Sequence, residues 1–549
     1  SQVTSMGRRT NLHADIFGRG PSATSCELSP AIPHVLTIGE IEQITADYAQ
    51  ACATLKDCGF DGADLAFYDD QLPDQFWSPQ TNHRRDRYGG VLENRLRFSL
   101  DVLEAIRGAV GREFIVGARV SGDDRLPGGL SPEELLEIIQ RLDRTEQLDY
   151  FTVTGGTIST FRSRGWNIPS AYYGLGTFVT LAGRIRSTVN TPVIVTGRIV
   201  TPAQAEQVLK SGAADLVGMT RALIADPDLP TKARNQQPEQ IRVCMGSNEG
   251  CIDRLYFGLP IGCVQNPVVG REQSWGNLTP ATKPRHIVVI GGGPAGMETA
   301  RVAASRQHQV TLLERDNKLG GAIQIVARAS GWESYLQCVT WLKNQLQDLE
   351  IDIRLETDAT TNLIRSLSPD AVVVATGAEP RRPNLAGANL PHVVTVSDIL
   401  SGSASPSGRC VILDETGYTP GATTADTLSQ LGYDVEIVTR QYALGEDIGT
   451  TVRAVLHERL LRTGVRITTL HTPVEITTSG VRLMHVLTDE ERFIEADTVV
   501  LSSSGIGRDA LHRELGEGNN YELHLIGDAF APRHLRHAMV DGARTGRAL

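Results

Sequence analysis

The sequence predicts an α/β protein: a parallel (β/α)8, or TIM, barrel followed by two Rossmann-like nucleotide-binding domains. Three observations support this. Short apolar runs alternate with amphipathic helical stretches from residue 35 to 235, a glycine-rich turn follows an apolar strand near residue 290, and a second strand–turn–helix unit begins near residue 409. A length of 549 residues is too great for one core and fits about three domains.

Five apolar runs in the first half have the spacing of parallel barrel strands. Helical segments separate them, and the segment from Pro202 to Gly212 carries the residues that helix ends prefer. The opening residues, SQVTSMGR, can supply a sixth strand, and a closed barrel needs two more. The five runs end at Phe67, Ser121, Gly156, Arg198 and Arg221.

The last two predicted strands end in residues typical of a phosphate site. Gly197 and Arg198 follow one strand, and Gly218 and Arg221 follow the next. Barrels bind phosphate at this place through exposed backbone N–H groups. Glycine can equally serve a turn at either position alone, but its recurrence in consecutive strands favours phosphate.

A dinucleotide-binding fingerprint opens the second half. An apolar strand leads into Gly291, Gly293 and Gly296 and then into a helix, and the next strand ends at Glu314. The glycines permit a tight turn and close approach of a pyrophosphate, and the acid suits ribose hydroxyls.

Three later segments are similar to the parts that complete an FAD-type site in the glutathione-reductase-like fold. They are LGG at 319–321, VVVATG at 372–377 and LIGDA at 525–529. In that resemblance Gly321 and Gly377 belong to the site, and Asp528 meets the ribityl or pyrophosphate region.

The second strand–turn–helix unit departs from the fingerprint. Its turn contains Asp414 and Glu415, and the glycines stand at Gly417 and Gly421. Two acids beside the pyrophosphate position oppose NAD(P)H binding, so we expect a structural unit.

The order of these parts resembles the family of trimethylamine dehydrogenase, histamine dehydrogenase, 2,4-dienoyl-CoA reductase and the dimethylglycine and N-methylproline demethylases. The resemblance covers almost the whole chain. The matching motifs are DQFWSPQTNHRRDRYGGVLENRLRF at 74–98, GARVSGDD at 117–124, VTGR at 195–198, VGMTRALIADPDL at 217–229, the cysteine segment at 242–263 and GGGPAGMETAR at 291–301.

The resemblance implies FMN at the carboxyl mouth of the barrel and FAD or ADP in the Rossmann site. Gln2 would contact the flavin pyrimidine edge, Arg119 would lie near flavin N1, and the glycine–arginine pairs would hold the phosphate. The family's first two barrel strands precede the position of Ser1, so we expect the sequence to begin inside the barrel. The expected parts are the barrel at 1–235, a cysteine-rich linker at 236–283, the FAD- or ADP-binding domain at 284–400 plus 497–549, and an inserted Rossmann-like domain at 401–496.

The loop before residue 74 departs from the family pattern. Many members place Tyr or His and another His here, whereas this sequence has Ala66, Asp69 and Gln71. The loss of a proton donor disfavours enoyl reduction. Tyr68, Asp69 and Arg119 are the candidate catalytic residues. Nearby aromatic side chains can form a cation–π bowl for a methylated ammonium, namely those of Phe67, Tyr68, Trp77, Phe161, Trp166 and Tyr173.

Cys244, Ser247, Cys251 and Cys263 occupy the family's positions for four iron–sulfur ligands. Serine replaces the second cysteine, and an alkoxide forms less readily than a thiolate. Three well-spaced thiols still resemble a [4Fe-4S] site. Occupancy by a cluster is therefore open at this point.

The leading hypothesis is a cytoplasmic, homo-oligomeric, FMN-dependent dehydrogenase of N-methylated amines or amino acids that passes electrons to an electron-transferring flavoprotein or a similar acceptor. The net charge of −11 argues against nucleic acid as a partner, and no apolar run reaches the roughly 20 residues of a membrane span. Two alternatives remain: an NAD(P)H-dependent 2-enoyl or 2,4-dienoyl-CoA reductase, and an inactive nucleotide-binding subunit that serves assembly.

Overall fold

The computed structural model describes residues 1–9, 17–516 and 520–549. The chain forms two compact units, Ser1–Thr220 and Arg221–Leu549. Each unit combines parallel sheets with helices, as predicted.

The first unit contains a six-stranded parallel sheet in the order β1-β4-β5-β6-β7-β8. Each strand pairs with the next in chain order, as in a (β/α) barrel, and the described part of the sheet has its edges at β1 and β8. The five predicted strands and the possible sixth are all present. Their bounds are β1 Gln2–Val3, β4 Gly62–Phe67, β5 Ile115–Ser121, β6 Tyr150–Thr154, β7 Val193–Val195 and β8 Leu216–Val217.

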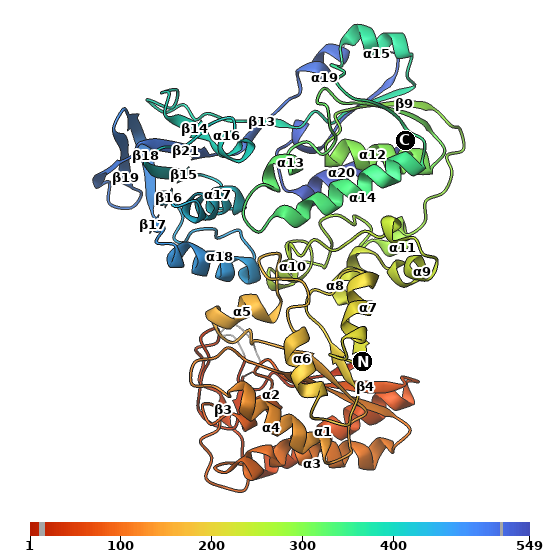
Figure 1. Ribbon diagram of the computed structural model, residues 1–549, viewed down its shortest axis with the longest axis vertical. Coiled ribbons are helices and arrows are strands. Elements are labelled where there is room, and N and C mark those ends of the chain that lie inside the picture. The colour runs from red at the N-terminus through yellow and green to blue at the C-terminus, as the bar shows by residue number, and fades with distance from the viewer. Residues whose placement is uncertain (10–16, 517–519) are drawn as a thin grey trace. The chain divides into compact units, whose positions relative to one another are not determined.

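Helices connect these strands, and Figure 1 shows α1, α3 and α4 side by side along the barrel unit. The predicted helix at 202–212 forms α7, Pro202–Lys210, which begins after the N-cap Thr201 and is followed by Gly212 at a φ of 71°. The other helices are α1 Ile38–Asp57, α2 Leu72–Trp77, α3 Leu92–Val110, α4 Pro132–Asp143, α5 Phe161–Asn167 and α6 Val179–Arg186, and β2 Arg19–Gly20 pairs with β3 His34–Val35.

The two faces of the barrel sheet differ in chemistry. Leu65, Phe67, Val116, Val120 and Val153 belong to the unit's apolar core. Because side chains alternate along a strand, the opposite face takes the intervening residues. Register places polar residues together there: Gln2 lies opposite Asp64, and Arg119 lies between Ala66 and Thr152.

The second unit begins with a five-stranded parallel sheet in the order β11-β10-β9-β12-β23. Figure 1 shows α12, α14 and α20 gathered against it. The strands are β9 His286–Ile290, β10 Gln309–Leu313, β11 Asp352–Arg354, β12 Ala371–Val374 and β23 Glu522–Leu525, and the helices are α12 Pro294–Ser305, α14 Leu336–Asp348 and α20 Leu535–Ala548.

A second five-stranded parallel sheet, in the order β14-β21-β15-β16-β17, carries α17 and α18, and an antiparallel sheet β18-β19-β20 follows β17 in the chain. In the parallel sheet, β14 and β21 lie outside the expected range 401–496. They belong to this sheet because β21 pairs with β15 and β14 pairs with β21. The bounds are β14 Val393–Thr395, β15 Arg409–Asp414, α17 Thr419–Gln430, β16 Asp434–Thr439, α18 Thr450–Arg462, β17 Arg466–Thr468, β18 His471–Thr477, β19 Gly480–His485, β20 Glu491–Glu495 and β21 Thr498–Ser502.

Residues 221–235, which we expected in the barrel, belong to the second unit. The buried Asp226 explains this: its carboxylate accepts hydrogen bonds from Arg242 N at 2.8 Å and from Lys232 Nζ at 2.7 Å. Asn266 Nδ2 also donates to Ala225 O at 3.1 Å. These contacts join the segment to the cysteine-rich region rather than to the strands that precede it.

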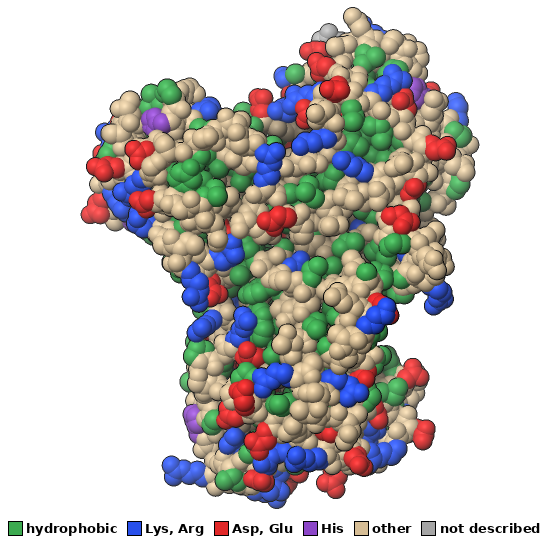
Figure 2. Space-filling view, in the orientation of Figure 1, with side chains coloured by type: hydrophobic (Ala, Val, Ile, Leu, Met, Phe, Trp, Pro, Cys, Tyr) green, Lys and Arg blue, Asp and Glu red, His purple; other side chains and the backbone are tan. Residues whose placement is uncertain are grey.

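Charges of both signs cover the surface. Figure 2 shows Lys and Arg side chains interspersed with Asp and Glu on the visible face. Within the described ranges, no helix is long and apolar enough to cross a membrane.

Glu436 on β16 is a buried anion surrounded by cations. Its side chain is fully buried and accepts hydrogen bonds from Arg409 Nη2 at 2.7 Å, Arg466 Nε at 3.3 Å and Thr468 Oγ1 at 2.7 Å. Burial acts to raise the pKa of Glu436, but the hydrogen bonds from Thr468 and the arginines outweigh it and hold the pKa below its ordinary value.

We predict that Glu436→Gln lowers the free energy of unfolding by on the order of 3 kcal/mol, because it removes the anion that compensates the arginines. The control is Glu458→Gln, which removes a half-exposed partner of Arg462 and should change stability by less than about 0.5 kcal/mol. Urea unfolding of the full chain measures both variants. Equal effects would show that the buried pair contributes no more than a surface pair.

Candidate functional site

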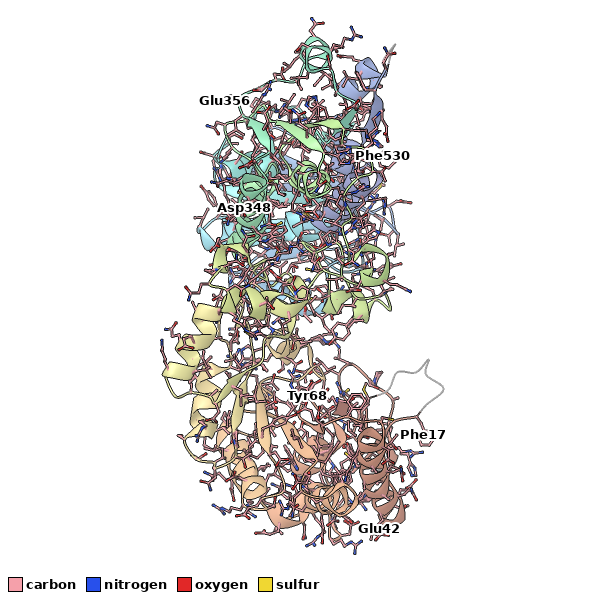
Figure 3. All side chains as sticks on the ribbon, turned by 90° about the vertical axis from the view of Figure 1, so that its right-hand side faces the viewer. Phe17, Glu42, Tyr68, Asp348, Glu356 and Phe530 are labelled. Carbon is pink, nitrogen blue, oxygen red and sulfur yellow. The ribbon has the colours of Figure 1, made fainter. Side chains whose placement is uncertain are left out.

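The parallel pairing of β1 with β4 brings the loops after these strands to the same end of the sheet. Leu72 N donates to Ser5 O at 2.9 Å, and Arg8 N donates to the Gln75 side chain at 3.0 Å, so the two loops are joined. Figure 3 labels Tyr68 in this region, inside the barrel unit and away from Phe17 and Glu42 at its surface.

Two consecutive aspartates in the β4 loop have left-handed backbone conformations. Asp69 has a φ of 59° and Asp70 a φ of 56°, and both residues are 6% exposed. Each carboxylate faces an arginine from the β1 loop: Arg9 Nη1 lies 3.3 Å from Asp69 Oδ2, and Arg8 Nη2 lies 3.0 Å from Asp70 Oδ1. Strained backbone of this kind persists where surrounding contacts enforce it, often at functional sites.

The loop after β6 supplies a third set of contacts. Ile158 N donates to Asp69 Oδ1 at 2.6 Å, and Ser159 Oγ donates to Asp70 Oδ2 at 2.6 Å. Both aspartates are therefore fixed from two directions. Three loops at the carboxyl ends of strands converge on one polar site, which is where barrel enzymes place their chemistry.

Burial raises the pKa of three carboxyls at this site, those of Asp69, Asp74 and Asp124. It raises the pKa of Asp69 to about 6, against the opposing effects of Arg9 and the Ile158 N–H. It also raises the pKa of Asp124 to about 7 and that of Asp74 well above the ordinary value. At neutral pH, Asp69 is thus mainly ionised and titrates within the physiological range.

Tyr68 and Arg119 lie against one another beside this cluster. The Arg119 guanidinium carbon is 4.7 Å from the centre of the Tyr68 ring. Burial raises the pKa of the Tyr68 phenol, so it stays protonated at neutral pH. Arg119 Nε is buried on the polar face of the sheet without a hydrogen-bond partner in the described part of the chain, and this donor fits a bound flavin.

The other predicted FMN contacts have mixed surroundings. Gln2 is exposed and donates from Nε2 to Asp64 Oδ2 at 2.8 Å. Gly197 has a φ of 100°, and a Cβ there would meet the Phe178 ring at 2.5 Å, so only glycine fits. The N–H of Gly218 donates to Val195 O at 2.7 Å.

The two phosphate-site arginines also have protein partners. Arg198 Nη1 donates to Ala171 O at 3.1 Å and to Tyr173 O. Arg221, in the second unit, donates to Asn248 Oδ1 at 2.6 Å. Their contact with an FMN phosphate stays a prediction.

The prediction of a cation–π bowl is wrong for two of its six aromatic side chains. Phe67 and Trp77 are fully buried and pack edge to face with ring centres 6.0 Å apart, and Trp77 Nε1 donates to Ser99 Oγ at 2.9 Å. They belong to the apolar core because their strand and helix positions face inward. Phe161 is 61% exposed, and Trp166 packs under Arg125.

The fingerprint turn of the second unit forms a cradle that only glycine allows. A Cβ at Gly296 would lie 1.9 Å from Gly291 O, and a Cβ at Gly291 would lie 2.4 Å from Ala375 O. Gly293 is the N-cap of α12 and has open space around it. The helix N-terminus and the open turn fit a pyrophosphate.

The remaining predicted residues of this site lie around the same turn or at its sheet. Glu314 Oε2 accepts from Gly292 N at 2.6 Å, and a Cβ at Gly321 would lie 3.2 Å from Gly293 Cα. Gly377 follows β12 with a φ of 74°. Asp528 follows β23, and burial raises its pKa.

In the second Rossmann-like unit, the Asp414 carboxylate lies within the turn. Asp414 Oδ1 accepts from Thr416 Oγ1 at 2.8 Å and from Ser502 Oγ at 3.2 Å, and a Cβ at Gly421 would lie 3.1 Å from Oδ1. A buried acid in this position opposes an anionic pyrophosphate. The structural role of this unit stays a prediction.

Cys244, Ser247, Cys251 and Cys263 line one small pocket in the second unit, together with Arg221. Burial raises the pKa of Cys251 to about 12, against the effect of Arg221, and raises that of Cys263 as well. Among the described residues, no three His, Cys, Asp or Glu side chains surround a single metal-ion position. The three thiols suit the separate irons of a cluster, whereas Ser247 is a poor fourth ligand. The cluster stays a prediction.

Comparison with known proteins matches both halves of the chain. Residues 2–240 match the NADH:flavin oxidoreductase / NADH oxidase family, and residues 285–524 match pyridine nucleotide-disulphide oxidoreductases. Over 510 residues the chain is 36% identical to the N,N-dimethylglycine/sarcosine dehydrogenase of Chromohalobacter salexigens, covering 91% of this chain and 73% of that protein. The chain belongs to the NADH:flavin oxidoreductase family.

Other members show the same breadth of coverage. The metal reductase of Desulforamulus reducens is 34% identical over 96% of this chain and 83% of its own length. Histamine dehydrogenase from Rhizobium sp. 4-9 has a TM-score of 0.92 and 26% identity over all of this chain and 83% of its own. Family membership confirms the predicted fold class and resemblance: the protein is an FMN-dependent oxidoreductase with a second domain of the FAD- and NAD-binding type.

Sequence reasoning missed the two arginines that face the aspartates. The available signal was the pair Arg8-Arg9 directly after one strand and the pair Asp69-Asp70 directly after the strand beside it. Adjacent parallel strands send such pairs to one end of a sheet, so opposite charges there predict contact.

We predict that Glu314→Ala reduces the adenine nucleotide retained per chain at least tenfold, because it removes both the acceptor for Gly292 N and the predicted ribose acceptor. Asp316→Ala removes an exposed acid two residues away and is the control. Denaturation followed by chromatography measures the released nucleotide. Unchanged retention in Glu314→Ala would contradict the assignment of this turn.

We predict that Ser247→Cys raises the iron and acid-labile sulfide per chain after anaerobic purification, because a thiolate forms more readily than an alkoxide. Cys251→Ser should lower both quantities. Ser247→Ala shows whether the serine itself is a ligand. Identical iron contents in all four proteins would exclude this pocket as the cluster site.

Proposed function

We propose that this enzyme oxidises N-methylated amines or amino acids and removes the methyl group as formaldehyde. The observation that supports the proposal best is the buried Asp69 carboxylate at the carboxyl end of the barrel strands, flanked by Tyr68 and Arg119. The dehydrogenase names of two similar proteins support the same reading.

A carboxylate at this position selects the charge of the substrate. An ionised Asp69 attracts an ammonium group and repels the partly negative oxygen of an enoyl carbonyl. Enoyl reduction also needs an acid that donates a proton to the substrate carbon. Asp69 accepts hydrogen bonds from the Ile158 N–H and the Arg9 guanidinium, which oppose the rise in its pKa caused by burial, and with a pKa of about 6 it is mainly ionised at neutral pH.

Residues of this chain then have separate roles. Asp69 holds the amine nitrogen beside the flavin position, and the Tyr68 phenol, kept neutral by burial, offers a hydrogen bond or an aromatic face to the methylated nitrogen. The Arg119 guanidinium places positive charge where a reduced flavin carries negative charge.

The overall reaction removes two electrons from the substrate as a hydride. Bound FMN would supply a hydride acceptor. The ammonium bound by Asp69 first releases its proton to water, and the uncharged amine then loses a hydride from its methyl carbon and becomes an iminium. Water adds to that carbon, the C–N bond breaks, and the products are formaldehyde, the demethylated amine and a second proton.

Electrons leave the enzyme for an external acceptor. We propose an electron-transferring flavoprotein or a similar carrier, because Asp414 opposes nicotinamide nucleotide binding in the second Rossmann-like unit. The proposal places the enzyme in the cytoplasm as a homo-oligomer.

We predict that Asp69→Asn lowers kcat/KM for an N-methylated amine by about 10²-fold, because the carboxylate that binds the ammonium is lost. Asp61→Asn, which neutralises an exposed acid at the other end of the same strand, is the control. Anaerobic flavin reduction followed by absorbance measures the rate. Reduction by NADPH with an enoyl thioester as oxidant, and none by amines, would overturn the proposed function.

The pH profile supplies a second readout. Since the pKa of Asp69 is raised to about 6, its negative charge is lost as pH falls through 6, and kcat/KM should fall with it. Asp69→Asn should lack this limb of the profile.

A further inference from the structure

Arg9 is a buried cation whose hydrogen bonds are incomplete. Its side chain is 8% exposed, and its Nε is buried with no hydrogen-bond partner among residues 1–9, 17–516 and 520–549. Nη1 has a single contact of 3.3 Å with Asp69 Oδ2, and Nη2 faces the Gln71 amide oxygen. A buried guanidinium donor without an acceptor is unfavourable, so such a group indicates an acceptor that arrives with a ligand.

The neighbouring pair shows what a closed arginine–aspartate contact looks like in this site. Arg8 Nε donates to both oxygens of Asp70, at 3.1 and 3.0 Å, and Arg8 Nη1 donates to Ser25 O at 2.8 Å. In both pairs the arginine comes from the loop after β1 and the aspartate from the loop after β4, and the side chains are buried to a similar extent. Arg8 is satisfied by a bidentate contact, whereas Arg9 meets Asp69 through one nitrogen and keeps Nε unpaired.

Asp69 and Gln71 add a reason to place Arg9 at the substrate position. Both lie in the loop after β4 at the carboxyl end of the barrel strands, and both contact Arg9. Asp69 divides its oxygens between Ile158 N and Arg9, so the Arg9 contact is the one that a cationic ligand would replace.

We propose that the substrate is a zwitterionic N-methylated amino acid whose ammonium group is bound by Asp69 and whose carboxylate is bound by Arg9. This inference rests on the proposed function and names its substrate class. In the free enzyme the two charged side chains compensate each other. When the zwitterion binds, each side chain gains an opposite charge from the ligand, and Arg9 Nε gains an acceptor.

A simple amine does not complete this exchange. It takes the Asp69 carboxylate and leaves Arg9 buried without its anion, which disfavours the complex. The site therefore discriminates by the presence of a carboxylate next to the methylated nitrogen, and Arg9 determines that specificity.

The test compares N,N-dimethylglycine with N,N-dimethylglycinamide, which has the same methylated nitrogen and no carboxylate. Wild-type enzyme, Arg9→Gln and Arg9→Lys are assayed as holoenzymes by anaerobic flavin reduction. We expect wild-type KM to be at least about 30-fold lower for the acid than for the amide, which is about 2 kcal/mol by the relation of tenfold to 1.4 kcal/mol.

In Arg9→Gln the KM for the acid should rise by about the same factor, whereas the KM for the amide should not rise, because the amide complex no longer leaves a buried guanidinium without its anion. Arg9→Lys keeps the charge and should restore part of the preference for the acid. Flavin content and melting temperature of each variant show that the fold is retained.

The outcomes separate the two proposals. If both compounds reduce the flavin with equal KM in the wild type, or Arg9→Gln impairs both equally, the zwitterion inference fails and amine oxidation stands. If neither these compounds nor simple N-methylated amines reduce the flavin, both proposals fail. A selective loss of the acid in Arg9→Gln with recovery in Arg9→Lys supports both.

Discussion

The candidate functional site depends on the parallel pairing of β1 with β4. Because both strands run in the same direction, the loops that follow them leave the sheet at one end, and the arginines of one loop meet the aspartates of the other. Antiparallel pairing would send these loops to opposite ends. Asp69 and Asp70 have left-handed backbone conformations and are buried, and burial together with the Ile158 N–H sets the charge of Asp69.

The two Rossmann-like turns of the second unit show how one local fold gives different chemistry. At the first turn, glycines leave space, and the Glu314 carboxylate accepts the Gly292 N–H from the side. At the second turn, the Asp414 carboxylate lies within the turn and accepts hydrogen bonds from Thr416 and Ser502. The strand and helix are preserved in both turns, whereas the position of a single carboxylate differs; that only the first turn binds a nucleotide stays a prediction.

The residues of the barrel site lie far apart in the sequence, whereas those of the nucleotide turn lie close together. The fingerprint residues lie within one strand–turn–helix segment, so their geometry follows from local backbone rules. The barrel residues come from loops far apart in the sequence, as in the contact between Arg9 and Asp69, which are sixty positions apart.

The sequence by itself determined six strands of the parallel barrel pattern and the glycine cradle, and FMN followed from the family resemblance. The strands and the cradle follow from hydrophobic periodicity, turn residues and short motifs, all of which act within a few residues. The tertiary structure alone decided that Phe67 and Trp77 belong to the core, that β14 and β21 complete the second sheet, and that Arg8 and Arg9 face Asp70 and Asp69. The physical reason is that burial and ion pairing depend on which distant segments meet, and strand register fixes that meeting only when the whole sheet has formed.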